Sequence, residues 1–267
     1  GISKGGETTL IFKAEYPKDV DLAVVYVAPL IQGQEDPRTE QHLKTVGSED
    51  CRNKIEAFQR LLLEHRDSIQ IYLAAEATEK AWTYEEMSIP EALEYATLEF
   101  PFSFWQWGGK CAEIPDADAT ARSMFNYVNG IVGFDFYSDA MCSYFLPSYY
   151  QHLAELGYYG FDTEPVEDLL EIAKAPSNLR FVPKGVEINY DPGYIRNVID
   201  YVEHKGTKIL YVYGGYDTWG ACAVTPDPSI DALKMVLPTG DHRTRIKNFS
   251  EEEQTLMLNT LHRWMGN

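Results

Sequence analysis

The sequence has no apolar run long enough to cross a bilayer, and its four cysteines show no C-x-x-C spacing. A transmembrane helix needs about 20 predominantly apolar residues, so we expect no membrane span. Without the spacing of a zinc or redox pair, the cysteines predict neither a metal nor another cofactor. They are compatible with free buried thiols or with up to two disulfides, for which three pairings exist: the four are Cys51, Cys111, Cys142 and Cys222.

Basic residues are scarce as well. The chain has 23 Lys and Arg against 41 Asp and Glu, a net charge of −18. Such a surface repels phosphate backbones and anionic lipids, which argues against nucleic acid as a partner. The same field attracts a cation such as a peptide amino terminus, although many proteins are acidic simply for solubility. The 18 Tyr and 5 Trp fit either a cleft lined by rings or a core rich in them.

Hydrophobic patterning predicts an α/β protein with a long helical interruption. Strands are predicted over 22–27, 208–213 and 233–237, and the second has the continuous apolar character of a buried parallel strand. No sustained strand signal appears between residues 31 and 180. We therefore expect a core formed by residues 1–31 and 185–267, with residues 32–184 inserted as a helical cap or lid. Helices are predicted over 4–16, 51–75, 82–98, 116–128, 135–156, 164–173, 194–204 and 250–264.

The first residues, Gly1-Ile2-Ser3-Lys4-Gly5, read G-x-S-x-G. In a nucleophile elbow, a serine sits on a sharp strand-to-helix turn, and small neighbours are needed because backbone passes close by on both sides. The helical pattern that follows at once agrees with this geometry. The motif is common by chance, so its interpretation depends on what accompanies it.

Two further reactive residues follow predicted strands. Asp217 comes after strand 208–213 and His242 after strand 233–237, and parallel strands bring their carboxyl ends to one edge of the sheet. The order Ser3, Asp217, His242 is that of α/β-hydrolases. Ser3 would attack a carbonyl, His242 would accept its proton, Asp217 would orient the imidazole, and the N–H of Lys4 would stabilise the oxyanion. Singly, each residue is more often an ordinary loop residue, and Asp241 beside His242 is a rival acid.

Local sequence around these positions resembles that of the bacterial prolyl tri- and tetrapeptidyl aminopeptidases, secreted serine peptidases of α/β-hydrolase fold with a helical cap. The resemblance implies an enzyme that releases tripeptides or tetrapeptides from a free amino terminus, with proline at the cleaved position. It also implies the triad Ser3, Asp217 and His242, and a secreted or periplasmic location. The similar stretches are 1–6, 26–30, 35–38, 211–219 and 240–246.

Such an exopeptidase must recognise a charged amino group and an apolar proline. Glu35 and Asp36, just past the strand end at Leu30, are the predicted carboxylates, with solvated loop acids as the plainer alternative. For the proline pocket we predict the aromatic run 100–107, with Phe102, Trp105 and Trp107 as its candidate residues. Packing of helix against helix explains these rings equally well.

A complete α/β-hydrolase has several strands before the elbow, and this sequence starts at the elbow glycine. Three explanations are open: the amino-terminal half is a missing part of the same protein, it is a separate chain, or the start is assigned differently. We expect the isolated chain to be inactive or poorly folded. Two other functions stay open: an esterase or lipase that uses the same triad, and a catalytically silent fragment or binding protein on this scaffold.

Overall fold

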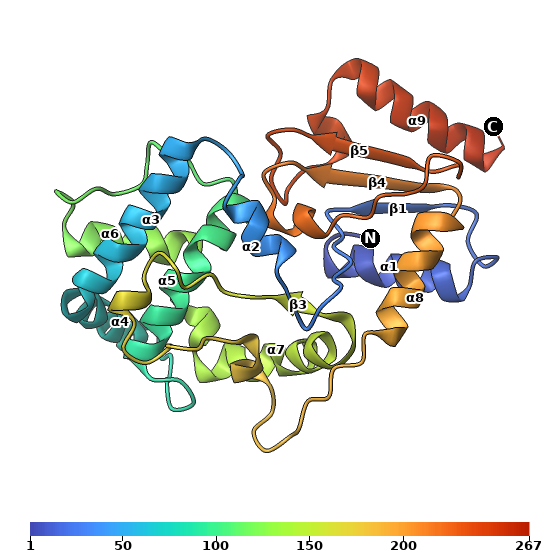
Figure 1. The fold of residues 1–267 in the computed structure, drawn as a ribbon. Coiled ribbons are helices and arrows are strands. Elements are labelled where there is room, and N and C mark those ends of the chain that lie inside the picture. Colours follow the sequence, from blue (N-terminus) through green and yellow to red (C-terminus); the bar gives the residue numbers. More distant parts are fainter. Residues whose placement is uncertain (267) are drawn as a thin grey trace.

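The computed structural model describes residues 1–266, and its centre is a three-stranded parallel sheet. The strands are β1 (Ala23–Tyr26), β4 (Ile209–Gly214) and β5 (Leu233–Leu237), in the order β1-β4-β5. Helices α1 (Lys4–Glu15) and α8 (Gly193–His204) cover one face, and α9 (Glu251–Met265) covers the other (Figure 1). The chain thus has the mixed α/β architecture and all three strands that its sequence predicts.

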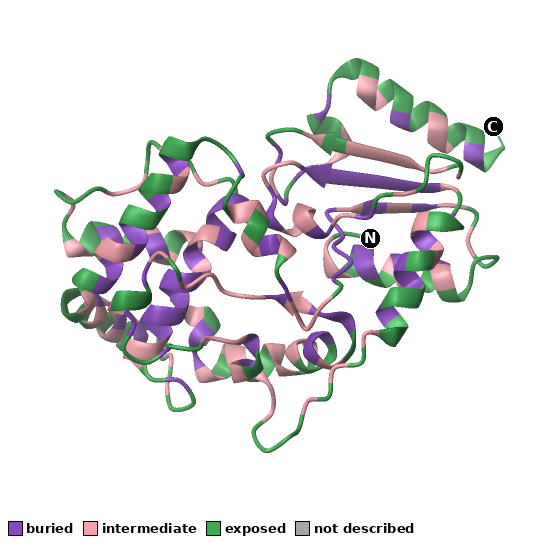
Figure 2. Cartoon of the chain, in the orientation of Figure 1, coloured by how far each residue is buried: buried purple, intermediate pink, exposed green. Residues whose placement is uncertain are grey.

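The central strand β4 is buried along its whole length because both faces of the sheet are covered (Figure 2). Alternate side chains point to opposite faces of a strand. Ile209, Tyr211 and Tyr213 accordingly pack with α1 and α8, whereas Leu210 and Val212 pack with α9. This double burial explains the continuous apolar run in the sequence.

Between β1 and α8 the chain forms a largely helical segment with a hydrophobic core of its own. Two short strands, β2 (Glu35–Asp36) and β3 (Tyr158–Tyr159), pair beside it. How far this segment is a separate domain with boundaries at 32 and 184 stays a prediction. Its helices are α2 (Arg38–Leu43), α3 (Glu49–Glu64), α4 (Arg66–Lys80), α5 (Ile89–Gln106), α6 (Ala121–Ile131) and α7 (Asp139–Gln151).

Single helical turns complete the chain. They comprise a π-turn, η2 (His152–Leu156), and the 3₁₀ turns η1 (Phe134–Tyr137), η3 (Glu167–Leu169), η4 (Asn178–Phe181), η5 (Thr218–Cys222) and η6 (Ile246–Asn248).

Two predicted helices differ from the observed ones because a buried carboxylate, Glu94, organises its neighbours. The predicted helix 164–173 is only the short turn η3, since the amides of residues 171, 172 and 173 donate to Glu94 instead of closing helical turns. The predicted helix 51–75 is broken at His65 into α3 and α4, and Arg66 just after the break pairs with Glu94 at 3.1 Å.

Helix α5 starts later and runs further than its prediction, through the aromatic run and past Pro101. A proline inside a helix leaves the carbonyl four residues earlier without its N–H partner. That carbonyl belongs to Thr97, and it accepts a hydrogen bond of 2.8 Å from the Gln59 side chain of α3. Helix α5 can therefore continue through Pro101 without an orphaned carbonyl at this point.

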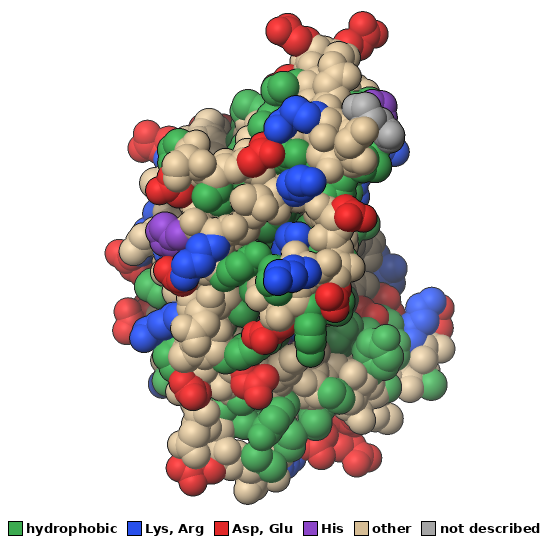
Figure 3. Space-filling model, turned by 90° about the vertical axis from the view of Figure 1, so that its right-hand side faces the viewer, with side chains coloured by type: hydrophobic (Ala, Val, Ile, Leu, Met, Phe, Trp, Pro, Cys, Tyr) green, Lys and Arg blue, Asp and Glu red, His purple; other side chains and the backbone are tan. Residues whose placement is uncertain are grey.

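A disulfide joins Cys51 at the start of α3 to Cys111 after α5, with 5.3 Å between the Cα atoms. Cys142 is a half-buried free thiol and Cys222 a buried one. In residues 1–266 no helix has the length and apolar character needed to traverse a bilayer. On the face drawn in Figure 3, Lys and Arg side chains are interspersed with Asp and Glu and form no continuous basic surface among the described residues.

Candidate active site

Ser3 lies on a sharp turn between extended chain and helix. Ile2 bridges Tyr26 in parallel, the Ser3 N–H donates to the Tyr26 carbonyl at 2.9 Å, and α1 starts at the next residue. Ser3 has φ 53° and ψ −128°, a conformation that side-chain-bearing residues rarely adopt and that typically costs about 1–3 kcal/mol. Lys4 opens α1, so its N–H has no acceptor within the helix and lies at the positive end of the helix dipole.

Close packing around this turn involves Gly1 and Gly6. A Cβ on Gly1 would lie 2.1 Å from the Gly5 carbonyl oxygen, and one on Gly6 would lie 2.6 Å from the Ala28 Cβ. A Cβ on Gly5 would meet no atom within 4 Å. The expectation of close backbone on both sides of the serine is thus correct for Gly1 but wrong for Gly5, because the turn is pressed against Ala28 at Gly6.

Asp217 and His242 form a buried pair. The His242 Nδ1 lies 2.7 Å from the Asp217 Oδ2; Asp217 is 0% exposed and His242 is 5% exposed. Burial raises the pKa of Asp217 above its ordinary value, against the opposing effect of its hydrogen bond with His242. The other Asp217 oxygen accepts the N–H of Trp219 at 3.2 Å, which holds the carboxylate in place.

Two loops, one after β4 and one after β5, must nearly touch for this pair to form. A Cβ on Gly214 would lie 2.4 Å from the Gly240 carbonyl oxygen, and one on Gly215 would lie 2.3 Å from that of Pro238. The Tyr216 N–H also donates to the Gly240 carbonyl at 2.9 Å. The two glycines at the end of β4 therefore allow Asp217 to approach His242, which lies 25 residues further along the sequence.

Asp241, the rival acid, makes a different contact. Its carboxylate binds Arg243, whose Nε donates at 3.0 Å and whose backbone N–H donates at 2.7 Å. These bonds lower the pKa of Asp241 despite the opposing effect of its partial burial. The imidazole of His242 thus pairs with Asp217 and not with its sequence neighbour.

Ser3 approaches the same edge of the sheet as this pair. The segment Gly1–Ser3 runs parallel to β1, so Ser3 lies at the carboxyl edge where the loops of Asp217 and His242 also emerge. Among residues 1–266 no hydrogen bond joins the Ser3 hydroxyl to His242. Catalytic hydrogen bonds are often long without substrate and shorten when it binds.

The end of α5 is docked onto the loops that carry the acid and the base. The Gln106 carbonyl accepts the N–H of His242 at 3.0 Å, and the Phe102 carbonyl accepts the hydroxyl of Thr218 at 3.1 Å. The Trp107 ring stands edge-on to the His242 ring, with centroids 5.6 Å apart. The aromatic run thus links the helical segment directly to the candidate active site.

A cavity of about 170 Å³, which we call the aromatic cavity, extends from this contact into the helical segment. Trp107 and Trp219, the neighbours of His242 and Asp217, form part of its wall. Ring-lined pockets of this kind bind apolar groups such as a prolyl side chain. Its lining residues are Glu99, Phe102, Ser103, Gln106, Trp107, Val132, Phe136, Tyr137, Tyr149, Tyr158, Tyr159, Phe161, Phe181 and Trp219.

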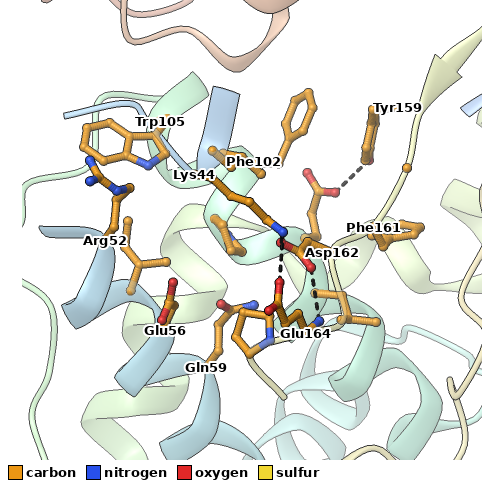
Figure 4. A pocket seen from close by; sticks show the side chains of 17 residues that line it. Lys44, Arg52, Glu56, Gln59, Phe102, Trp105, Tyr159, Phe161, Asp162 and Glu164 are labelled. Carbon is orange, nitrogen blue, oxygen red and sulfur yellow. Dashed lines mark hydrogen bonds and ion pairs between the residues drawn. The ribbon is translucent and has the colours of Figure 1, made fainter. Parts of the chain in front are cut away.

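Phe102, Trp105 and Trp107 do not share one pocket. Phe102 and Trp107 line the aromatic cavity, whereas Trp105 lines a second cavity of about 250 Å³, on whose wall Phe102 also lies (Figure 4). Charged side chains such as Lys44 and Asp162 surround this second cavity. Trp105 is 3% exposed and packs against Tyr216, so its observed contacts are those of a core residue.

Glu35 and Asp36 lie outside the aromatic cavity and already have partners. The Glu35 carboxylate accepts from the Ser177 hydroxyl at 2.8 Å and the Asn178 N–H at 2.7 Å. Asp36 is buried, which opposes its ionisation, but hydrogen bonds from Arg38 and from backbone amides hold its pKa below the usual range. Their assignment to a substrate amino group stays a prediction, and the observed contacts join segments of the fold.

Sequence reasoning missed Glu99, a carboxylate in the wall of the aromatic cavity. The signal that could have revealed it is the spacing Glu99, Phe102, Ser103 and Gln106, which places four residues on one face of α5. For a metal, no three His, Cys, Asp or Glu side chains converge anywhere in residues 1–266.

Two comparisons with known proteins give matches. The profile of a family described as PS-10 peptidase S37 matches residues 1–266. A prolyl tri/tetrapeptidyl aminopeptidase of Streptomyces mobaraensis is 28% identical over 273 residues, an alignment that covers 100% of this chain and 57% of that protein. The chain thus spans little more than half the length of this relative. No solved structure gives a significant match.

Proposed function

The chain belongs to the PS-10 peptidase S37 family, and on this premise we propose that the protein is a serine exopeptidase that releases tripeptides or tetrapeptides from a free amino terminus. The observation that carries the proposal is the buried Asp217–His242 pair at the sheet edge where the strained Ser3 turn also lies. The name of the Streptomyces relative supports the peptide length and the preference for proline.

The proposed chemistry is acyl transfer through a covalent intermediate. Because the Nδ1 of His242 binds Asp217, its Nε2 is the atom available to accept the Ser3 proton. The Ser3 Oγ then adds to the carbonyl carbon, and the N–H of Lys4 donates to the resulting oxyanion. His242 returns the proton to the leaving amine as the peptide bond breaks, and water releases the acyl group by the same steps.

We further propose that the fold is that of an α/β-hydrolase with an inserted helical cap, formed by the segment between β1 and α8. The parallel sheet, the serine turn and the docking of α5 onto the Asp217 and His242 loops support this assignment. Phe102, Trp107 and Trp219 would provide the apolar surface for proline. The Cys51–Cys111 disulfide supports a secreted or periplasmic location, because disulfides persist in oxidising compartments.

The test is labelling with a fluorophosphonate, which reacts with activated serines, in the full-length wild-type protein and in its Ser3→Ala variant. We expect the wild type to be labelled and Ser3→Ala to lose both labelling and hydrolysis of Ala-Ala-Pro anilide. Labelling that survives the substitution would reject Ser3 as nucleophile. Short acyl esters tested beside the anilide separate an esterase from a peptidase, and an unlabelled wild type would favour a silent binding protein.

A further inference from the structure

Glu99 is a carboxylate without a cationic partner inside the helical segment. Its Oε1 accepts from the Ser103 hydroxyl at 2.8 Å, and its Oε2 accepts from the Tyr159 hydroxyl at 2.7 Å. Both donors are neutral, and within residues 1–266 no Lys, Arg or His forms an ion pair with Glu99. A carboxylate oxygen has room for more than one donor, so each oxygen retains acceptor capacity.

The surroundings of Glu99 suit a cation that comes from outside the fold. Phe102, Tyr159 and Trp219 line the same cavity, and the half-buried Glu99 lies on the wall of this cavity and also on that of the second cavity. Burial raises the pKa of Glu99 to about 7, against the hydrogen bonds from Tyr159 and Ser103. An ammonium group in the cavity would stabilise the ionised carboxylate, and the ring faces would add cation–π attraction.

Helix α5 sets the distance from Glu99 to the candidate active site. Gln106, whose carbonyl binds the His242 N–H, lies seven residues further along α5, which at 1.5 Å per residue is about 10 Å. From the amino nitrogen to its third carbonyl carbon, an extended peptide spans about 10 Å, at about 3.3 Å per residue. The rise along α5 from Glu99 to Gln106 thus matches the span of three peptide residues.

We propose that Glu99 binds the α-ammonium group of the substrate and thereby sets the released fragment at three residues. This inference rests on the proposed peptidase function and names the residue that sets the length of the peptide released. It differs from the prediction for Glu35 and Asp36, whose carboxylates lie outside the cavity and bind groups of the fold. The third residue, proline in the proposed function, would then lie beside Trp107 and His242.

The experiment compares Ala-Ala-Pro anilide with its N-acetylated form on the intact protein. The wild type should favour the free amino terminus, and Glu99→Gln should reduce the ratio of the two kcat/KM values by about 10- to 100-fold, as expected for loss of a charged hydrogen bond. Glu99→Asp, which keeps the charge but withdraws it by one methylene, should reduce the ratio less. Fluorophosphonate labelling of each variant reports whether the site is still assembled.

Glu56→Gln is the matched control, because Glu56 is an exposed carboxylate that lines the second cavity and not the aromatic one. It should leave the ratio unchanged. The role of Glu99 would be overturned if the ratio of the two kcat/KM values is unchanged in Glu99→Gln and Glu99→Asp. It would also be overturned if this ratio falls in Glu35→Gln instead. Equal wild-type cleavage of Ala-Ala-Pro and Ala-Ala-Ala-Pro anilides would overturn the three-residue length. A full-length wild-type protein that neither labels nor cleaves would refute the peptidase function itself.

Discussion

Replacing Asp217 by Asn removes one negative charge and keeps the side-chain shape, so it isolates the electrostatic role of this carboxylate. When His242 accepts the Ser3 proton, an imidazolium forms whose Nδ1 lies 2.7 Å from the Asp217 Oδ2. With an effective dielectric constant of about 20 and charge centres about 3–4 Å apart, the attraction is about 4–6 kcal/mol. Asparagine also donates to Nδ1, which favours the tautomer with the proton on Nε2, the wrong one for a base.

We therefore expect Asp217→Asn to lower kcat/KM for Ala-Ala-Pro anilide by about 10³- to 10⁴-fold, since about 1.4 kcal/mol corresponds to a factor of ten. KM should change much less, because the interaction forms in the transition state. Asp217 also accepts the Trp219 N–H, so its replacement could displace the wall of the aromatic cavity. Inhibition by the product Ala-Ala-Pro reports whether the binding site is still intact.

The matched variant is Asp241→Asn, which removes the same charge from the residue beside His242. Its carboxylate binds Arg243, so we expect a loss of tenfold or less. The reasoning is refuted if Asp217→Asn keeps at least a tenth of the wild-type kcat/KM with normal product inhibition. It is equally refuted if Asp241→Asn is the more damaging of the two.

Two further predictions concern the helical segment. Glu94→Ala should lower the free energy of unfolding by about 3–5 kcal/mol, measured by urea denaturation, because it leaves three amides without their acceptor and removes one ion-pair partner of the half-buried Arg66. A loss below about 1 kcal/mol would contradict this. Burial raises the pKa of Glu99 from 4.5 to about 7, so the folded protein binds this proton more tightly than the unfolded chain does. Relative to Glu99→Gln, the wild type should lose stability as pH rises from about 4.5 to 7. A gain in the relative stability of the wild type over that range would contradict the raised pKa.

Much of the sheet and part of the site were predictable because they depend on local patterns. Strand β5 matches its prediction residue for residue, and β4 is displaced by only one residue, since a fully buried strand needs a continuous apolar run. The serine turn was predictable from small residues followed by a helical pattern. The positions of Asp217 and His242 followed from their place after two parallel strands.

Predictions within the helical segment were less accurate because distant side chains decide its local structure. The amides of residues 171–173 donate hydrogen bonds to the Glu94 carboxylate, 77 to 79 residues away, and not to carbonyls of a helix. Gln59 satisfies the Thr97 carbonyl that Pro101 leaves free, so α5 continues where proline usually ends a helix. No local pattern contains these partners.

The order of the strands along the chain, the serine turn and the candidate reactive residues can therefore be predicted from the amino-acid sequence alone. Those features follow from residue-by-residue preferences for burial and backbone conformation. Folding in three dimensions sets three other features: His242 pairs with Asp217 and not Asp241, Trp107 rather than Trp105 faces His242, and Glu99 has no cationic partner within residues 1–266. Each of these depends on which atoms lie within a few ångströms after folding, and for Asp217 and His242 the backbone packing of Gly214 against Gly240 sets that proximity.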